Sequence, residues 1–180
     1  IAEKVQKHMI DYNPNSIWCI QSWGGNPKQS LLKGLNKKNT LIIDLCGEYF
    51  TMWKKSKGFW EKPWVFSTII QYGGNTGLHG RLEELANNLK DSYSQKNPPI
   101  GIGTTWESIE INPVINDFLS DMRWEKDIPN VTEWVEEYAV RRYGFDSPNI
   151  RKAWNIILET AYGTYKNHRR PTESIFCAPP

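Results

Sequence analysis

The chain has 180 residues, of which 39% are hydrophobic and 23% charged, a composition that supports a folded core and excludes a disordered segment. Lysine and arginine outnumber aspartate and glutamate by 22 to 20, and a formal charge of +2 is too small for the basic footprint of a nucleic-acid-binding protein. No apolar run approaches the roughly 20 residues that span a bilayer. We therefore expect neither a nucleic-acid partner nor a membrane span.

Cysteine and histidine patterns point away from metal chemistry. The three cysteines are far apart and form no Cys-x-x-Cys pair, and the three histidines have no matched ligand spacing. We expect no metal and no cofactor. The nine tryptophans favour sugar stacking slightly, although core packing is the more ordinary role of any single one.

The chain opens with an amphipathic helical pattern over residues 1–13, and it begins as though cut from a longer polypeptide. Four short apolar runs then predict buried strands, at 16–20, 40–44, 64–70 and 100–104. Their starts lie 24, 24 and 36 residues apart, which is the spacing of β/α units. A parallel sheet is therefore expected.

The intervals between these strands predict helices of unequal quality. Asn26-Pro27 is expected to open a first helix, leucines at helical spacing mark a second over 78–89, and Asn112-Pro113 opens a third. The interval 48–60 is aromatic and basic without periodicity. It predicts a long loop that could wall a binding cleft.

After about Asp127 no strand pattern follows, and helices are predicted to open at Thr132 and at Ser147-Pro148. Four β/α units make half of a (β/α)8 barrel, which typically needs about 250 residues. The chain is thus either a small open α/β sheet or the second half of a barrel. We expect the latter, with a partial barrel over 1–126 and the beginning of an all-α domain over 127–180.

Reactive groups in such folds lie beyond the carboxyl ends of the strands. The side chains at these exits are amides, hydroxyls, indoles and carboxylates, which suit a neutral polyol better than a phosphate. The candidate substrate-binding residues are Gln21, Trp23, Asp44, Gln71, Asn75 and Trp106.

Gly73-Gly74-Asn75 could be read as a phosphate loop, but it lacks both the spacing of a dinucleotide fingerprint and the Lys of a P-loop. A tight turn that needs positive φ is the simpler interpretation. A nucleotide-linked open α/β enzyme stays a weaker alternative.

Glu107 is the candidate catalytic residue, because a carboxylate at a strand exit fits the known mechanism of glycoside hydrolysis. Retaining glycosidases place two carboxyl groups about 5–5.5 Å apart, one as nucleophile and one as acid and then base. A carboxylate that follows a strand is rigidly aimed, and hydrogen bonds from neighbouring donors would keep it ionised. It could equally cap the next helix.

Several runs in order resemble the family 89 glycoside hydrolases, the α-N-acetylglucosaminidases. They are IWCIQSW, TLIIDLCGE, QYGGNTGLHGRLEEL, IGIGTTWESIEINPVINDFLSDMRW, WVEEYAVRRYG and the closing RRP, and they cover nearly the whole chain. The resemblance implies a (β/α)8-type catalytic barrel followed by an all-α domain. It also implies retaining hydrolysis of terminal α-linked N-acetyl-D-glucosamine.

Carried onto this sequence, the nucleophile of the family falls on Glu107. The family has Pro-Glu-Gly there, whereas this chain has Trp106-Glu107-Ser108. The acid/base glutamate of the family lies on an Asn-Glu strand end, and nothing before Ile17 matches it. The missing amino-terminal half of the enzyme is therefore an expected partner.

The resemblance further implies glycan substrates such as heparan sulfate and mucin-like glycans, and a lysosomal, secreted or periplasmic location. Lys54, Lys55 and Lys57 could help an anionic chain to approach. The alternative to an enzyme is a glycan-binding or structural fragment of the same fold, which would not require Glu107.

Overall fold

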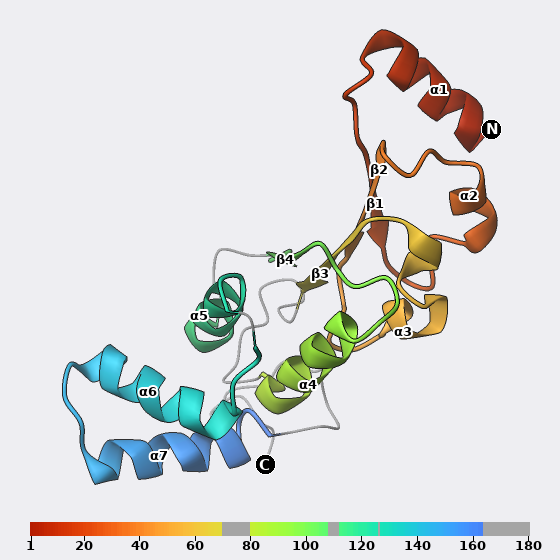
Figure 1. Ribbon diagram of the computed structural model, residues 1–180. Helices are drawn as coiled ribbons and strands as arrows, with labels where there is room; N and C mark the ends of the chain where they lie inside the picture. Colours follow the sequence, from red (N-terminus) through yellow and green to blue (C-terminus); the bar gives the residue numbers. More distant parts are fainter. Residues whose placement is uncertain (70–79, 108–111, 126, 164–180) are drawn as a thin grey trace, which may run out of the picture. The chain divides into compact units, whose positions relative to one another are not determined.

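The computed structural model describes residues 1–69, 80–107, 112–125 and 127–163 (Figure 1). It divides into two compact units. Unit 1 comprises 1–69 and 88–105, and unit 2 comprises 70–87 and 106–180. Each unit has its own arrangement of elements.

Unit 1 is built on a parallel sheet of four strands in the order β1-β2-β3-β4. The strands are β1 (Trp18–Ser22), β2 (Thr40–Asp44), β3 (Trp64–Thr68) and β4 (Gly101–Thr104). All three neighbouring pairs are parallel. The four predicted strands and their direction are thus confirmed, with ends shifted by no more than two residues.

The two faces of this sheet differ in what covers them. Ile42 of β2 is paired with Trp64 of β3, and Trp64 stacks on Trp53 of a helix at 6.2 Å between ring centroids. That face is the helix-covered one. The other face carries Cys19 and Gln21, which are both exposed.

Helix α1 (Ala2–Tyr12) precedes the sheet, as the amphipathic pattern predicted. Its Gln6 is 3% exposed, because the side-chain amide donates to Asn39 O at 3.0 Å and to Thr40 Oγ1 at 2.9 Å. A buried glutamine therefore ties α1 to the residues that enter β2.

Two expectations about the connecting segments were wrong. Helix α2 (Gln29–Lys33) begins after Lys28 and not at Asn26-Pro27, because Trp23 and Asn26 close a turn through two backbone hydrogen bonds of 3.2 and 3.0 Å. The interval 48–60 is not one long loop, since it holds α3 (Met52–Ser56) and the first residues of the turn η1 (Phe59–Glu61). The local turn thus decides where α2 begins, and tertiary packing decides the interval 48–60, whose sequence lacks helical periodicity.

Helix α4 (Leu82–Tyr93) follows, with Leu82, Leu85 and Leu89 fully buried as their spacing predicted. Helix α5 (Pro113–Met122) buries its apolar stripe and is capped by Asn112, again as predicted. Helices α6 (Val131–Tyr143) and α7 (Pro148–Glu159) complete unit 2.

Helices α6 and α7 form a helical hairpin. Glu136 of α6 accepts hydrogen bonds from Arg151 and Asn155 of α7, each at 2.9 Å. Between them Gly144 ends α6 with φ +76°, a conformation that favours glycine. Among the described residues after 126 the structure has helices α6 and α7 and no strand.

No helix among the described residues is long and apolar enough to cross a membrane.

Candidate active site

The carboxyl edge of the unit 1 sheet gathers residues that are far apart in the sequence. Ser22 at the end of β1 is paired with Asp44 at the end of β2, and Asp44 is paired with Phe66 of β3. Paired residues of neighbouring strands share a face of the sheet. Gln21, one residue before Ser22, therefore lies on the opposite face from Asp44.

Asp44 lies on the helix-covered face and is 1% exposed. Burial raises the pKa of its carboxyl group to about 7, and hydrogen bonds from the Ser22 hydroxyl and the Cys46 backbone amide partly oppose that rise. Its Oδ2 atom accepts no hydrogen bond from the part of the chain that the structure describes. The carboxyl group therefore contacts the exits of both β1 and β2 and does not reach an open surface.

An aromatic cluster lies at the exits of β1 and β2. Trp23, 42% exposed, meets Phe50 edge-to-face at 5.8 Å between ring centroids, and Phe50 meets Tyr49 at 4.8 Å. The backbone amides of Tyr49 and Phe50 both donate to Cys46 O at 3.0 Å. Flat apolar faces at this edge suit the apolar side of a sugar ring.

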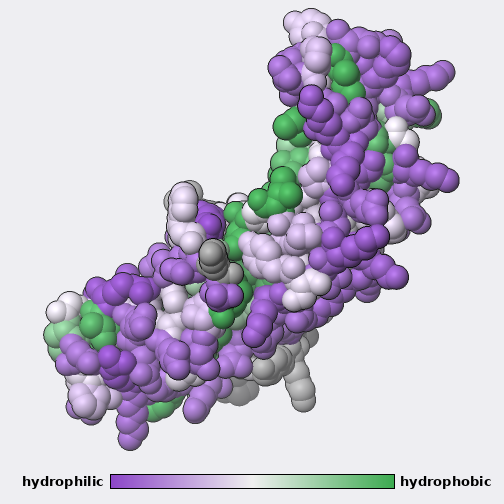
Figure 2. Space-filling view, viewed as in Figure 1, coloured by the Kyte–Doolittle hydropathy of each residue, from purple (hydrophilic) through white to green (hydrophobic). Residues whose placement is uncertain are grey.

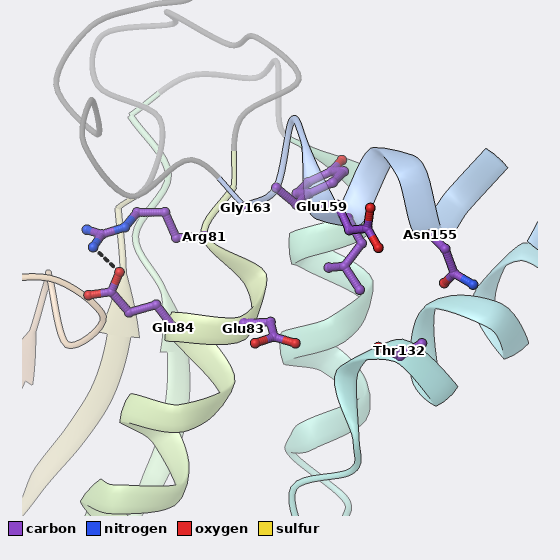
Figure 3. Close-up of a pocket in the computed structure, with 9 residues that line it drawn as sticks. Arg81, Glu83, Glu84, Thr132, Asn155, Glu159 and Gly163 are labelled. Atoms are coloured by element: carbon purple, nitrogen blue, oxygen red, sulfur yellow. Dashed lines mark ion pairs between the residues drawn. The ribbon is translucent and has the colours of Figure 1, made fainter. Parts of the chain in front are cut away.

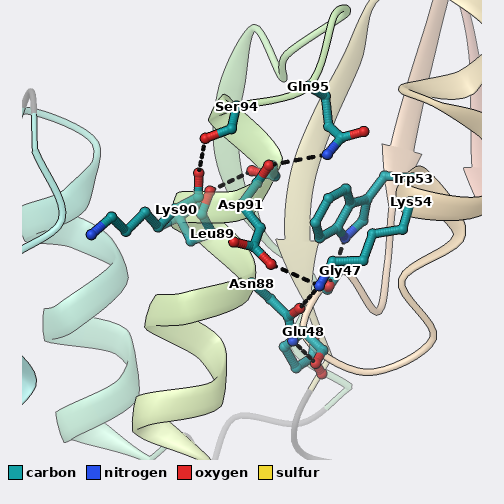
Figure 4. Close-up of polar contacts among 11 residues, drawn as sticks. Gly47, Glu48, Trp53, Lys54, Asn88, Leu89, Lys90, Asp91, Ser94 and Gln95 are labelled. Atoms are coloured by element: carbon teal, nitrogen blue, oxygen red, sulfur yellow. Dashed lines mark hydrogen bonds and ion pairs between the residues drawn. The ribbon is translucent and has the colours of Figure 1, made fainter.

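The exit of β2 is anchored to α4 by polar contacts (Figure 4). Asn88 of α4 donates to Glu48 O at 2.8 Å, and Trp53 Nε1 donates to Gly47 O at 2.8 Å. Lys54 adds an ion pair of 2.8 Å with Asp91. These contacts hold the segment that carries the aromatic cluster, and they commit Lys54 to a structural contact.

The exit of β4 is held just before the candidate nucleophile. Thr105 donates its backbone amide to Thr68 O at 3.1 Å, and its hydroxyl contacts Thr68 O at 3.1 Å and Ser67 Oγ at 3.2 Å. Glu107 follows two residues later in unit 2 and is exposed, while Trp106 is half-buried. The chain that leads to Glu107 is therefore tied to the neighbouring strand.

The remaining predicted site residues, Gln71 and Asn75, lie outside the described residues, as does the Gly73-Gly74 turn. No group of three or more His, Cys, Asp or Glu side chains within the described ranges could hold a metal ion.

Unit 2 contains a hollow of about 440 Å³ near the starts of α4 and α6 and the end of α7 (Figure 3). Arg81 forms an ion pair with Glu84 at one side, and Glu83, Glu159 and Asn155 also line it. Three carboxylates against one guanidinium make this lining unsuited to an anionic ligand. None of the predicted site residues that the structure describes lines it.

Comparison with known proteins identifies the family. The sequence model of the family described as the α-N-acetylglucosaminidase TIM-barrel domain matches residues 1–126. A second family model, described as the α-N-acetylglucosaminidase C-terminal domain, matches residues 134–180. The chain belongs to the α-N-acetylglucosaminidase family. Its four-stranded parallel sheet is accordingly part of a (β/α)8-type barrel, followed by the start of the all-α domain of that family.

Human α-N-acetylglucosaminidase is 26% identical to this chain over 169 residues, which cover 88% of the chain and 23% of the human protein. A family 89 glycoside hydrolase from Clostridium perfringens, solved in complex with 2-acetamido-1,2-dideoxynojirmycin, is 36% identical with a TM-score of 0.83. That match covers 91% of this chain and 19% of the bacterial one. The chain thus spans about a fifth of the length of these relatives.

The same bacterial enzyme has been solved with two glutamates replaced by glutamine, in complex with its substrate GlcNAc-α-1,4-galactose. The match to this substrate complex has a TM-score of 0.81 and 36% identity. It covers 89% of the present chain and 18% of the bacterial chain.

Sequence reasoning did not single out Tyr49 or Phe50 as site residues. The two aromatic residues carried a signal, because they stand together shortly after β2 in the interval predicted to wall a cleft. The place of Thr105 directly after the fourth strand marked it as a polar residue at the strand exit, but its contact with Thr68, 37 residues earlier, came only from the structure.

Proposed function

We propose that the polypeptide to which these residues belong is a retaining exo-glycosidase that removes terminal α-linked N-acetyl-D-glucosamine from glycans. The observation that carries this proposal is an exposed carboxylate, Glu107, three residues beyond β4 in a chain of the α-N-acetylglucosaminidase family. Catalytic groups of such barrels lie at this end of the strands.

In this mechanism the Glu107 carboxylate attacks the anomeric carbon and forms a glycosyl ester. The bond to the departing oxygen breaks as a second carboxyl group protonates that oxygen. Water then attacks the same carbon, the second group takes its proton, and the Glu107 carboxylate leaves. The anomeric configuration is retained after two inversions.

The requirement for two carboxyl groups has independent support. The substrate complex of the bacterial relative carries two Glu→Gln substitutions, and a double-displacement reaction needs two such groups. We propose that Glu107 corresponds to one of these. The acid/base would come from polypeptide outside these 180 residues, together with the other strands of the barrel.

We propose that Gln21, Trp23, Gln71, Asn75 and Trp106 contact the sugar. Gln21 and Trp23 are exposed at the carboxyl edge, which supports their assignment.

For Asp44 we propose a supporting role in place of the direct sugar binding that the sequence suggested. At 1% exposure it supports the site by holding the β2 exit through Ser22 and Cys46.

The domain division is also a proposal: a partial barrel over 1–126 and an all-α domain from 127 onward. The ranges matched by the two family models support it.

Glycosaminoglycan ends such as those of heparan sulfate are the natural substrate class that we propose.

The test compares Glu107→Gln with the unchanged protein in the complete polypeptide, on an aryl α-N-acetylglucosaminide. We expect kcat/KM to fall by at least about a thousandfold, because the nucleophile is lost while the shape is kept. Glu137→Gln, which removes an exposed glutamate of α6, is the control and should keep full activity. Equal rates for the Glu107 variant would leave only a glycan-binding role.

Azide distinguishes a nucleophile from an acid/base. In Glu107→Ala an added azide ion would occupy the position of the lost carboxylate and attack from its face, so we expect a β-glycosyl azide. An α-glycosyl azide would assign Glu107 to the acid/base role.

A further inference from the structure

We propose that the amino edge of the unit 1 sheet carries a second carbohydrate-binding site, for an acidic polysaccharide, formed by Trp60 and six surrounding lysines. We call this set the Trp60 surface. Its lysines are Lys33, Lys37, Lys55, Lys57, Lys62 and Lys96.

The Trp60 surface lies at the amino ends of the unit 1 strands, whereas the proposed active site is assigned to their carboxyl ends. Lys37 precedes β2, the turn η1 that contains Trp60 precedes β3, and Lys96 precedes β4. Because the strands are parallel, these entering segments meet at one edge of the sheet. The site is therefore independent of the proposed active site.

Two hollows share Trp60 as a common wall. One, of about 540 Å³, is also lined by Lys33 and Lys62, and the other, of about 570 Å³, by Lys37, Lys55, Lys57 and Lys96. Trp60 is half-buried, so part of its ring remains accessible. An extended ligand can thus contact both hollows across one aromatic ring.

The turn that presents Trp60 is held in an unusual conformation. Every residue from Lys57 to Glu61 has a positive φ, between 50° and 77°. Residues other than glycine adopt this region rarely, and such runs persist only when the surroundings hold them. Backbone conformations of this kind are frequent at ligand-binding sites, which is consistent with a binding role for the turn.

Asn97 holds the turn from outside. Its side-chain amide donates to Gly58 O at 2.6 Å and to Lys62 O at 2.8 Å, while its own carbonyl accepts from Trp64 Nε1 at 2.9 Å. A Cβ at Gly58 would lie 2.2 Å from Asn97 O, so only glycine fits there. The turn is therefore built against the segment that enters β4.

Neighbouring residues of the turn face opposite ways. Phe59 is fully buried and packs against Trp64 at 5.4 Å between ring centroids. Trp60, the next residue, lies at the surface of both hollows. The buried ring anchors the turn, and the half-buried Trp60 ring is left with part of its surface open to a ligand.

The charge of the surface is strongly one-sided. Glu61 is the one carboxylate among the residues that line the two hollows, and it lies 3.6 Å from Lys96. Burial and the neighbouring charge of Lys37 lower the pKa of Lys62. Lys62 also donates to Leu35 O, and the other ammonium groups that line the two hollows favour an anionic ligand.

An acidic polysaccharide fits both features of the site. Its sulfate or carboxylate groups would meet the lysines, and the apolar face of one sugar ring would stack on Trp60. A neutral glycan would leave the lysines unused. Figure 2 shows that the surface around α1 and α2 is mostly hydrophilic, in keeping with a ligand that binds through polar groups.

The test measures binding of a dextran sulfate oligosaccharide to the complete polypeptide, with neutral dextran and single-stranded oligothymidylate as parallel probes. We expect binding of the sulfated sugar that weakens as salt is raised. Replacing Lys37, Lys55 and Lys57 together by Gln should weaken it about tenfold. Trp60→Leu, which keeps apolar volume but no flat ring, should weaken it about fivefold.

A triple variant of Lys4, Lys90 and Lys152 to Gln makes the same change in net charge at exposed positions elsewhere, and it should bind as the unchanged protein does. Hydrolysis of the small aryl substrate should be unchanged in all of these variants. The proposal is overturned if the sulfated sugar does not bind, if the control triple variant weakens binding equally, or if oligothymidylate binds more tightly through Trp60.

Discussion

At the scale of single residues, Asp44 shows that a position at a strand exit does not by itself fix the face on which the side chain lies. The position after an apolar run correctly marks it as a residue at the carboxyl edge. The face on which it lies depends on the alternation of β2, and this alternation places it beneath the helices with 1% exposure. Its ionisation therefore affects stability, and its raised pKa of about 7 gives the direction of that effect.

Asp44→Asn should change how stability depends on pH. Because the pKa of Asp44 is raised from 3.8 to about 7 in the folded state, its stabilising contribution is present below pH 4 and is lost as the pH rises through 7. The unchanged protein should lose about 1 kcal/mol per pH unit in this window relative to the variant, whose side chain cannot ionise. Denaturant unfolding at several pH values measures the difference.

The exposed Asp127→Asn is the matched control, because it removes a carboxylate without disturbing a buried contact. If the stability of Asp44→Asn followed the same pH curve as that of the unchanged protein, burial would not govern this carboxyl group.

At the scale of elements, two asparagine caps of the same chemistry differ in their surroundings. Asn112 accepts from the amides of Val114 and Ile115, is 5% exposed, and also accepts from the Tyr162 hydroxyl at 3.1 Å. Asn130 accepts two amide hydrogen bonds at the start of α6 but is exposed. The Asn112-Pro113 pair correctly predicted the cap of α5. For α6 the predicted start was Thr132, which lies two residues after the observed cap, Asn130.

Asn112→Ala should therefore cost more stability than Asn130→Ala. We expect the free energy of unfolding to fall by about 2–3 kcal/mol for the buried cap, because an interior tyrosine hydroxyl also loses its acceptor, and by about 1 kcal/mol for the exposed one. Asn130-Val131-Thr132 fits the N-glycosylation sequon, so both variants are made in a host without N-glycosylation. Denaturant unfolding then measures the two losses. Equal losses would mean that the Tyr162 contact adds nothing.

At the scale of the whole molecule, the sheet has one face that these 180 residues leave open. Cys19 and Gln21 are exposed on it, whereas Cys46, two residues after the end of β2, is 1% exposed. In a closed barrel the inward face is packed with side chains. The proposed remainder of the barrel would therefore cover Cys19.

Thiol labelling of the complete polypeptide checks this closure. With Cys177 replaced by Ser, we expect Cys19 to react with a maleimide much more slowly than a free exposed thiol, and to become reactive on unfolding. Mass spectrometry of the peptide that contains Cys19 gives the rate. Rapid labelling of the folded protein would show that this face stays open to solvent.

The sequence by itself determined the four strands, the longer helices and the family, because helical and strand periods and ordered motifs are local properties of the chain; it did not determine α3 or the first residues of α2 and α6. Leu82, Leu85 and Leu89, or the run that became β2, needed no knowledge of their neighbours in space. Only the tertiary structure decided which face each strand residue occupies, because that depends on where the helices pack. It also gathered six lysines around Trp60 in a chain of net charge +2, since parallel strands bring together entry segments that are far apart in sequence.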